Sequence, residues 1–170
     1  MVRRLVIEDL RLVKMIHDLD ADVNNGALAF TVSRIADSLE DYERNIWLFD
    51  GKSLRQVTRG GSDYSPRILG GKGLVFLSRR GLGRDKPGVG VWYLPFDGSE
   101  AVRLAHVDGG VNDLRIVGDS MYFIGNVGPT QEDVKFVSEW PLWFNGRGFI
   151  HTFRSHLFSL DLSGAIRQVT

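Results

Sequence analysis

Cysteine is absent from the 170 residues of this chain. A disulfide framework is therefore excluded, and so is a metal site with thiolate ligands. The absence also fits a reducing compartment, and we expect a cytoplasmic protein. The four histidines are scattered, whereas a metal needs three or four converging ligands. His151 and His156 are close in sequence, but their odd spacing places them on opposite faces of a continuous strand. We expect no metal site and no cofactor.

An excess of charge of either sign is also missing, because 21 basic residues balance 21 acidic ones. No broad positive field is available to hold nucleic acid or an anionic membrane surface. No apolar run approaches the roughly 20 residues that span a bilayer. Glu8, Asp9 and Arg11 interrupt the apolar stretch that a secretory signal would need. The sequence thus predicts neither nucleic acid nor membrane as a partner.

The sequence also lacks the Gly-x-Ser-x-Gly elbow that presents the nucleophile of α/β-hydrolases. The segment nearest to this pattern, Gly118-Asp119-Ser120-Met121-Tyr122, has no second glycine, and we expect it to form a hairpin turn. Gly81-x-Gly83 and Gly88-x-Gly90 precede no helix whose N-terminus could hold a phosphate. We expect no catalytic residue in this chain.

Glycine is abundant, with 20 residues, which favours a fold with many tight turns. The main feature is a degenerate repeat that reads apolar strand, Asp/Gly/Ser turn, short strand. Its three copies lie at residues 45–58, 91–104 and 156–170, and Arg-Gln-Val-Thr ends both the first and the third. A second type of strand precedes each copy, around Phe30, Phe76 and Phe123. The chain is therefore built from repeats.

The period of the repeat predicts the architecture. Ile46 and Val91 are 45 residues apart, whereas Val91 and Leu157 are 66 apart, so the third unit carries an insertion, residues 126–154. A period of about 40 to 50 residues of short strands is typical of a β-propeller blade. We predict an all-β fold and one domain over residues 1–170, a partial propeller of about three four-stranded blades. The units are residues 26–66, 67–113 and 114–170.

One helix is predicted ahead of the blades, over residues 7–19. Ile7, Leu10, Val13 and Ile16 follow a helical spacing. Acidic residues near the start and basic residues near the end suit the helix dipole. We expect this stripe to pack on the protein itself, with docking to a partner or membrane as the alternative.

The insertion is the most individual segment. Glu139, Trp143, Arg147 and Phe149 are candidates for a substrate-binding mouth, in which Arg147 would pair with a carboxylate and the aromatic rings would form an apolar wall. In the alternative interpretation these aromatic residues cover the edge of a blade. A second charged segment, with Arg79, Arg80, Arg84 and Lys86, is interpreted as a solvated loop.

Several segments resemble the N-terminal β-propeller of the prolyl oligopeptidase family. They are the opening Glu8-Asp9-Leu10, the strand Leu28-Ala29-Phe30-Thr31, Ser65-Pro66-Arg67 ahead of Leu74-Val75-Phe76-Leu77-Ser78, and the Arg-Gln-Val-Thr endings. The segment Trp143-Phe144-Asn145-Gly146-Arg147-Gly148-Phe149 is similar to the acylaminoacyl peptidase branch. The resemblance extends over essentially the whole chain. The Ser-Pro-Asp-Gly turns frequent in that family have drifted here, for example to Val23-Asn24-Asn25-Gly26.

The resemblance implies a module that caps an α/β-hydrolase domain and admits only small peptides. The hydrolase domain with its Ser, Asp and His is absent from the 170 residues, so no catalytic residue is carried over. The partners implied are that domain, on the same or a separate chain, and small peptides. The alternative is a stand-alone scaffold that binds proteins or peptides and completes its ring as a homo-oligomer, since three blades are fewer than the four to eight of a closed propeller.

Overall fold

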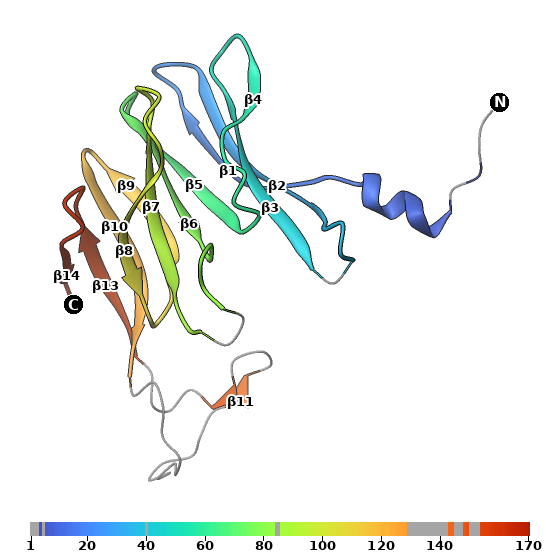
Figure 1. The fold of residues 1–170 in the computed structure, drawn as a ribbon. Helices are drawn as coiled ribbons and strands as arrows, with labels where there is room; N and C mark the ends of the chain where they lie inside the picture. Colours follow the sequence, from blue (N-terminus) through green and yellow to red (C-terminus); the bar gives the residue numbers. More distant parts are fainter. Residues whose placement is uncertain are drawn as a thin grey trace.

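The computed structural model describes residues 4, 6–39, 41–83, 86–128 and 154–170, and the backbone alone of 143–144 and 148–149. Three four-stranded antiparallel sheets stand side by side like the blades of a fan (Figure 1). A two-stranded hairpin, β11 (Trp143–Phe144) with β12 (Gly148–Phe149), lies apart from them. The all-β fold of about three blades is confirmed.

In each blade the chain runs back and forth through four neighbouring strands. Blade 1 contains β1 (Met15–Asp22), β2 (Ala27–Ile35), β3 (Tyr42–Phe49) and β4 (Leu54–Gln56). Blade 2 contains β5 (Asp63–Leu69), β6 (Gly73–Ser78), β7 (Val89–Pro95) and β8 (Val102–Val107). Blade 3 contains β9 (Asn112–Val117), β10 (Ser120–Val127), β13 (Arg154–Leu160) and β14 (Ile166–Gln168).

The repeats correspond to the two middle strands of each blade. Phe30 pairs with Trp47, Phe76 with Trp92, and Phe123 with Phe158. Blades 2 and 3 begin within four residues of the units predicted at 67 and 114, whereas blade 1 begins at Met15 rather than at 26. The first unit was placed too late because its opening strand had been assigned to the helix.

The predicted helix over residues 7–19 is wrong beyond its first turns. A short 3-10 helix, η1 (Ile7–Leu12), is followed directly by strand β1. A β-bulge in β1 makes two residues oppose one on β2 and shifts the strand alternation by one position. Val13 already has an extended backbone, and Ile16 and Leu19 lie on β1, so their spacing of three in the sequence does not form a helical stripe. Ile16 and Leu19 are largely exposed, so the stripe does not pack on the protein's own body as expected.

Two apolar cores hold the blades together. Between blades 1 and 2, Ala29 and Ile46 pack against Leu74 and Phe76. Between blades 2 and 3, a second cluster contains Val75, Val91, Leu114, Met121, Phe123 and Leu160. Each blade buries one face on its neighbour, as repeat architectures require. Within the part of the chain that the structure describes, no helix is long and apolar enough to cross a bilayer.

Candidate functional site

The two ends of the blades differ. One end carries short turns, such as Val23–Gly26 between β1 and β2. The opposite end carries the connections at residues 36–41, 57–62, 79–88 and 108–111, of which 79–88 is the longest. The insertion also leaves and returns at this end, because Val127 pairs with Arg154. Loops held on a rigid scaffold commonly carry binding residues, so the site is sought at this loop-bearing end (Figure 1).

The first strand of every blade is bulged at the same position. Asp18, Ser65 and Asp113 have φ angles of 53°, 51° and 48°, in the left-handed region that side chains rarely adopt. At each of them two residues oppose one phenylalanine on the next strand: Phe30, Phe76 or Phe123. Bulges redirect the neighbouring side chains, and left-handed non-glycine residues concentrate at functional sites.

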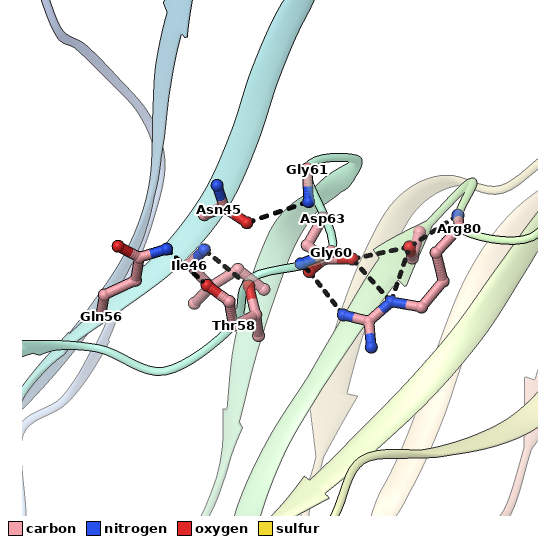
Figure 2. Close-up of polar contacts among 9 residues, drawn as sticks. Asn45, Ile46, Gln56, Thr58, Gly60, Gly61, Asp63 and Arg80 are labelled. Carbon is pink, nitrogen blue, oxygen red and sulfur yellow. Dashed lines mark hydrogen bonds and ion pairs between the residues drawn. The ribbon is translucent and has the colours of Figure 1, made fainter. Parts of the chain in front are cut away.

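The connection between blades 1 and 2 is held by hydrogen bonds to both blades, as Figure 2 shows. On blade 1, Asn45 Oδ1 accepts a hydrogen bond from the Gly61 amide at 3.0 Å, and the Ile46 amide donates to Thr58 Oγ1 at 2.9 Å. The Gly61 carbonyl accepts from the Arg44 amide at 2.8 Å. These hydrogen bonds fix the backbone at Arg44 and at Gly61, and so position Arg44 and the nearby Tyr64.

On blade 2, a buried carboxylate anchors the same connection. Asp63 is fully buried and accepts hydrogen bonds from Ser78 Oγ at 2.6 Å, from Arg80 Nε at 3.0 Å and from the Gly60 amide at 3.1 Å (Figure 2). Arg80 also lies over the Trp92 ring, 4.7 Å from its centre. The interpretation of this loop as a solvated face is therefore wrong for Arg80.

The same interpretation is wrong for Arg79. Its guanidinium donates to the backbone carbonyls of Gly88 and Lys86 at 3.0 and 2.9 Å. Arg79 thereby shapes the loop between β6 and β7 instead of pointing into solvent. Arg84 lies outside the described residues.

Two clefts open between neighbouring blades at the loop-bearing end. The first, of about 270 Å³, lies between blades 1 and 2 and is lined by His17, Asp18, Thr31, Tyr42, Arg44 and Tyr64. The second, of about 350 Å³, lies between blades 2 and 3 and is lined by Tyr64, Arg79, Asn112 and Asn126, together with the Asp108–Val111 turn. His17, Tyr64 and Asn112 each directly precede the bulge of their own blade. The bulges thus build equivalent clefts.

Tyr64 is shared by both clefts. Burial raises the pKa of its phenol, the nearby Asp18 adds to the increase, and Arg79 and Arg44 oppose it. The Arg44 guanidinium lies 5.9 Å from the centre of the Tyr64 ring, in a cation–π arrangement. Tyr64 is therefore a neutral hydrogen-bonding phenol between cationic groups.

One pair in the first cleft has the chemistry of a serine hydrolase. His17 Nε2 lies 2.8 Å from Ser33 Oγ. Ser33 is only 2% exposed, and among the described residues no carboxylate bonds to the other ring nitrogen of His17. Without an orienting acid and an accessible nucleophile, the pair lacks the arrangement that activates a serine.

Of the other histidines, His106 lies on blade 2 and His156 on blade 3, whereas His151 lies outside the described residues. His106 lies 2.9 Å from Asp108, and His156 Nδ1 lies 2.8 Å from the Thr170 carbonyl oxygen. No group of three metal-ligating side chains is found among the described residues. The segment Gly118-Asp119-Ser120 forms a turn between β9 and β10, as predicted, and Asp119 pairs with Lys72 there.

The candidate residues of the insertion stay a prediction. Glu139 and Arg147 lie outside the described residues. Trp143 and Phe149 pair through their backbones in the small hairpin, and their side chains also lie outside the description. The insertion does begin and end at the same end of the blades as the two clefts.

The cleft residues were missed at the sequence level. The predicted helix over residues 7–19 includes His17 and Asp18, which lie instead on strand β1. The available signal was the recurrence of a polar or aromatic residue followed by Asp or Ser ahead of each phenylalanine strand: His17-Asp18, Tyr64-Ser65 and Asn112-Asp113. This recurrence becomes visible only after the first strand of each blade is known.

No protein-family model matches the sequence, and the comparison with curated proteins finds no match either. Solved structures do match. An acylaminoacyl peptidase in complex with Z-Gly-Gly-Phe-chloromethyl ketone has 17% identity and a TM-score of 0.76, over 94% of this chain and 25% of the peptidase. The Pyrococcus horikoshii acylaminoacyl peptidase has 16% identity and a TM-score of 0.75, over 94% of this chain and 26% of the peptidase.

The β-propeller domain of the Trilobed protease from Pyrococcus furiosus is also similar, with 13% identity, a TM-score of 0.61 and coverage of 92% of this chain and 43% of that domain. The chain thus spans about a quarter of the length of the two acylaminoacyl peptidase chains. At these identities the likeness concerns the fold: the chain has the blade architecture of peptidase propellers, as the sequence resemblance predicted.

Proposed function

We propose that this chain is the N-terminal propeller portion of an acylaminoacyl or oligopeptidase-like serine peptidase. It selects small peptides for an α/β-hydrolase domain that lies outside these 170 residues. The observation that carries the proposal is the superposition of 94% of the chain on acylaminoacyl peptidases, of which it spans about a quarter. The clefts at the loop-bearing end, where the insertion also starts, support a role in peptide selection.

The first experiment concerns the hydrolase domain. Sequencing the coding DNA beyond the codon of Thr170, and the neighbouring genes, is expected to find an α/β-hydrolase domain with its Ser, Asp and His. A serine-directed fluorophosphonate is expected to label the assembled protein and not the chain alone. An intended terminus at Thr170 without any hydrolase gene to supply a partner would refute the proposal.

Selection by size requires a separate measurement. The assembled protein and its isolated hydrolase domain should be compared on acylated peptides of about five and about 30 residues. We expect the propeller to suppress cleavage of the long peptide and to leave the short one cleavable. Equal suppression or equal cleavage of both lengths would remove the selecting role while leaving the propeller assignment intact.

A second candidate, from a different class, is a stand-alone scaffold that completes its ring by self-association and binds a protein or peptide. One observation favours it. The aromatic face of blade 1, formed by Phe30, Trp47 and Phe49, is equivalent to the faces that blades 2 and 3 bury on the preceding blade. No other blade covers it within the described residues.

A further inference from the structure

The first cleft contains two charged side chains of opposite sign that do not neutralise each other. Arg44 and Asp18 both line it, yet neither takes part in an ion pair with any described residue. Among the described residues, the guanidinium of Arg44 contacts the Tyr64 ring in a cation–π arrangement and forms no ion pair. Both residues are exposed. The Arg44 guanidinium, a hydrogen-bond donor, and the Asp18 carboxylate, an acceptor, therefore line the same cleft.

The floor of this cleft contributes a third polar group. Thr31 lines the cleft and is fully buried, and its hydroxyl has no hydrogen-bond partner. An unsatisfied buried hydroxyl is costly, and such groups are rare in native structures. Thr31 lies opposite His17 on the paired strand, so this unused hydroxyl belongs to the lining of the same cleft as the two charges.

The remaining walls are apolar in part. Met15, Tyr42 and Tyr64 surround the charged groups, and Met15 and Tyr42 are 40% and 50% exposed. The volume of about 270 Å³ is below the roughly 300–1,000 Å³ of sites that enclose a drug-sized ligand. The cleft is therefore sized for the end of a chain and not for a whole cofactor.

We propose that this cleft binds the free carboxylate end of a short peptide. Arg44 donates to the terminal carboxylate, a planar group that matches the guanidinium fork. Asp18 accepts from a peptide N–H, the Thr31 hydroxyl bonds to the same end, and Tyr42 and Tyr64 flank the last side chain. The left-handed bulge at Asp18 is what brings its carboxylate to this position.

The charge arrangement selects this ligand over others. A fully ionised phosphate group offers no donor to Asp18, and an apolar ligand would leave both charges unpaired. A peptide end carries an acceptor and a donor within one residue. The inference rests on the proposed role in peptide selection, but it is tested by binding to this chain alone, without the hydrolase.

Binding is measured by isothermal titration calorimetry with the 170-residue chain and three N-acetylated tripeptide probes. One has a free terminal carboxylate, one is C-terminally amidated, and one is amidated but carries an internal aspartate. We expect the free carboxylate to bind about 10- to 100-fold more tightly than the amide, the range of one charge-assisted hydrogen bond. Equal binding of all three probes, or no binding of any, would overturn the proposal. Equal binding of the free-ended and aspartate probes would overturn its terminal specificity.

Two variants distinguish a ligand contact from a structural role. Arg44→Gln is expected to abolish the preference for the free carboxylate, whereas Arg167→Gln, an exposed residue on the outermost strand of blade 3, keeps it. Thr31→Val is expected to weaken binding without lowering the denaturation midpoint. Unchanged affinity in both Arg44→Gln and Thr31→Val would refute the site, whatever the outcome of the hydrolase experiments.

Discussion

Asp63 is the residue on which the junction of blades 1 and 2 depends most. It is fully buried, and its carboxylate holds Ser78, Arg80 and the Gly60 amide. Arg80 in turn lies over Phe76 and Trp92, in the core between the blades. One carboxylate thus ties the loop that positions Tyr64 to the apolar interface.

Replacing Asp63 by asparagine is expected to destabilise the chain by about 3–5 kcal/mol, because the Arg80 cation is then left half-buried without its counter-charge. Urea denaturation followed by Trp fluorescence gives the change. Asp119→Asn serves as the control, since its pair with Lys72 is exposed and worth about 0–1 kcal/mol. Equal losses in the two variants would show that burial of the Asp63 pair is unimportant.

Gly109 allows the closest backbone approach between blades 2 and 3. A Cβ added there would collide with the carbonyl oxygen of Asn126 in β10, a backbone atom that cannot swing aside. Gly109→Ala is expected to lower the free energy of unfolding by about 1–3 kcal/mol, as overpacking does. Gly83→Ala is the matched control, because a Cβ at Gly83 meets no atom within 4 Å. Thermal melts of both variants provide the comparison, and a neutral Gly109→Ala would refute the close approach.

At the scale of elements, the turn between the third and fourth strand is the part of the blade that recurs most faithfully. Asp50, Asp97 and Asp161 begin these turns and accept hydrogen bonds from the serine two or three residues further along. Such Asx turns explain why the Asp/Gly/Ser motif repeats in the sequence.

The hydrogen bonds from Ser53, Ser99 and Ser163 lower the pKa values of these three aspartates. A lowered folded pKa stabilises the protein at pH values above the unfolded pKa of 3.8, and the benefit disappears as the pH falls through the lower folded values. We therefore expect the urea concentration at the midpoint of unfolding to decrease when the pH is lowered below about 4. Converting all three residues to asparagine keeps the turns and should flatten this dependence.

The control for this experiment is Glu8→Gln with Glu100→Gln, which removes two exposed carboxylates that take no part in the Asp–Ser hydrogen bonds of the turns. Its midpoint should keep the pH dependence of the parent chain. If the turn variant retained the full dependence as well, the turn aspartates would not be its source.

For the whole molecule, the decisive feature is that no blade among the described residues covers one face of blade 1. Phe30 and Trp47 pair there as Phe76 and Trp92 do in blade 2, and Phe76 is fully buried against blade 1 whereas Phe30 and Trp47 are half-buried. The ammonium nitrogen of Lys14 lies over the Trp47 ring, 5.8 Å from its centre. An apolar face of this kind favours association.

The isolated chain is therefore expected to self-associate with rising concentration, and Trp47→Asp should shift it towards the monomer. Sedimentation velocity over a range of concentrations measures the effect. Val102→Asp, which removes an exposed apolar residue from the outermost strand of blade 2, should leave the association unchanged. A parent chain that stays monomeric at all concentrations would rule out the self-completing scaffold.

The sequence by itself determined the blades. The alternation around Phe30, Phe76 and Phe123, the Trp47-type partner strands and the Asp/Gly/Ser turns are local patterns, and local patterns specify strands and hairpins. They therefore predicted about three blades and the hairpin at Asp119, both of which the structure contains.

Only the tertiary structure decided where the clefts lie. The spacing of Val13 and Ile16 fits a helix as well as the extended chain that the structure contains, and the bulges at Asp18, Ser65 and Asp113 interrupt the alternation that would mark the first strand of each blade. The first cleft joins residues from β1, β2, β3 and β5, which are far apart in sequence. Their meeting depends on blade-to-blade packing and on the buried Asp63 network, and no local pattern of residues encodes such long-range contacts.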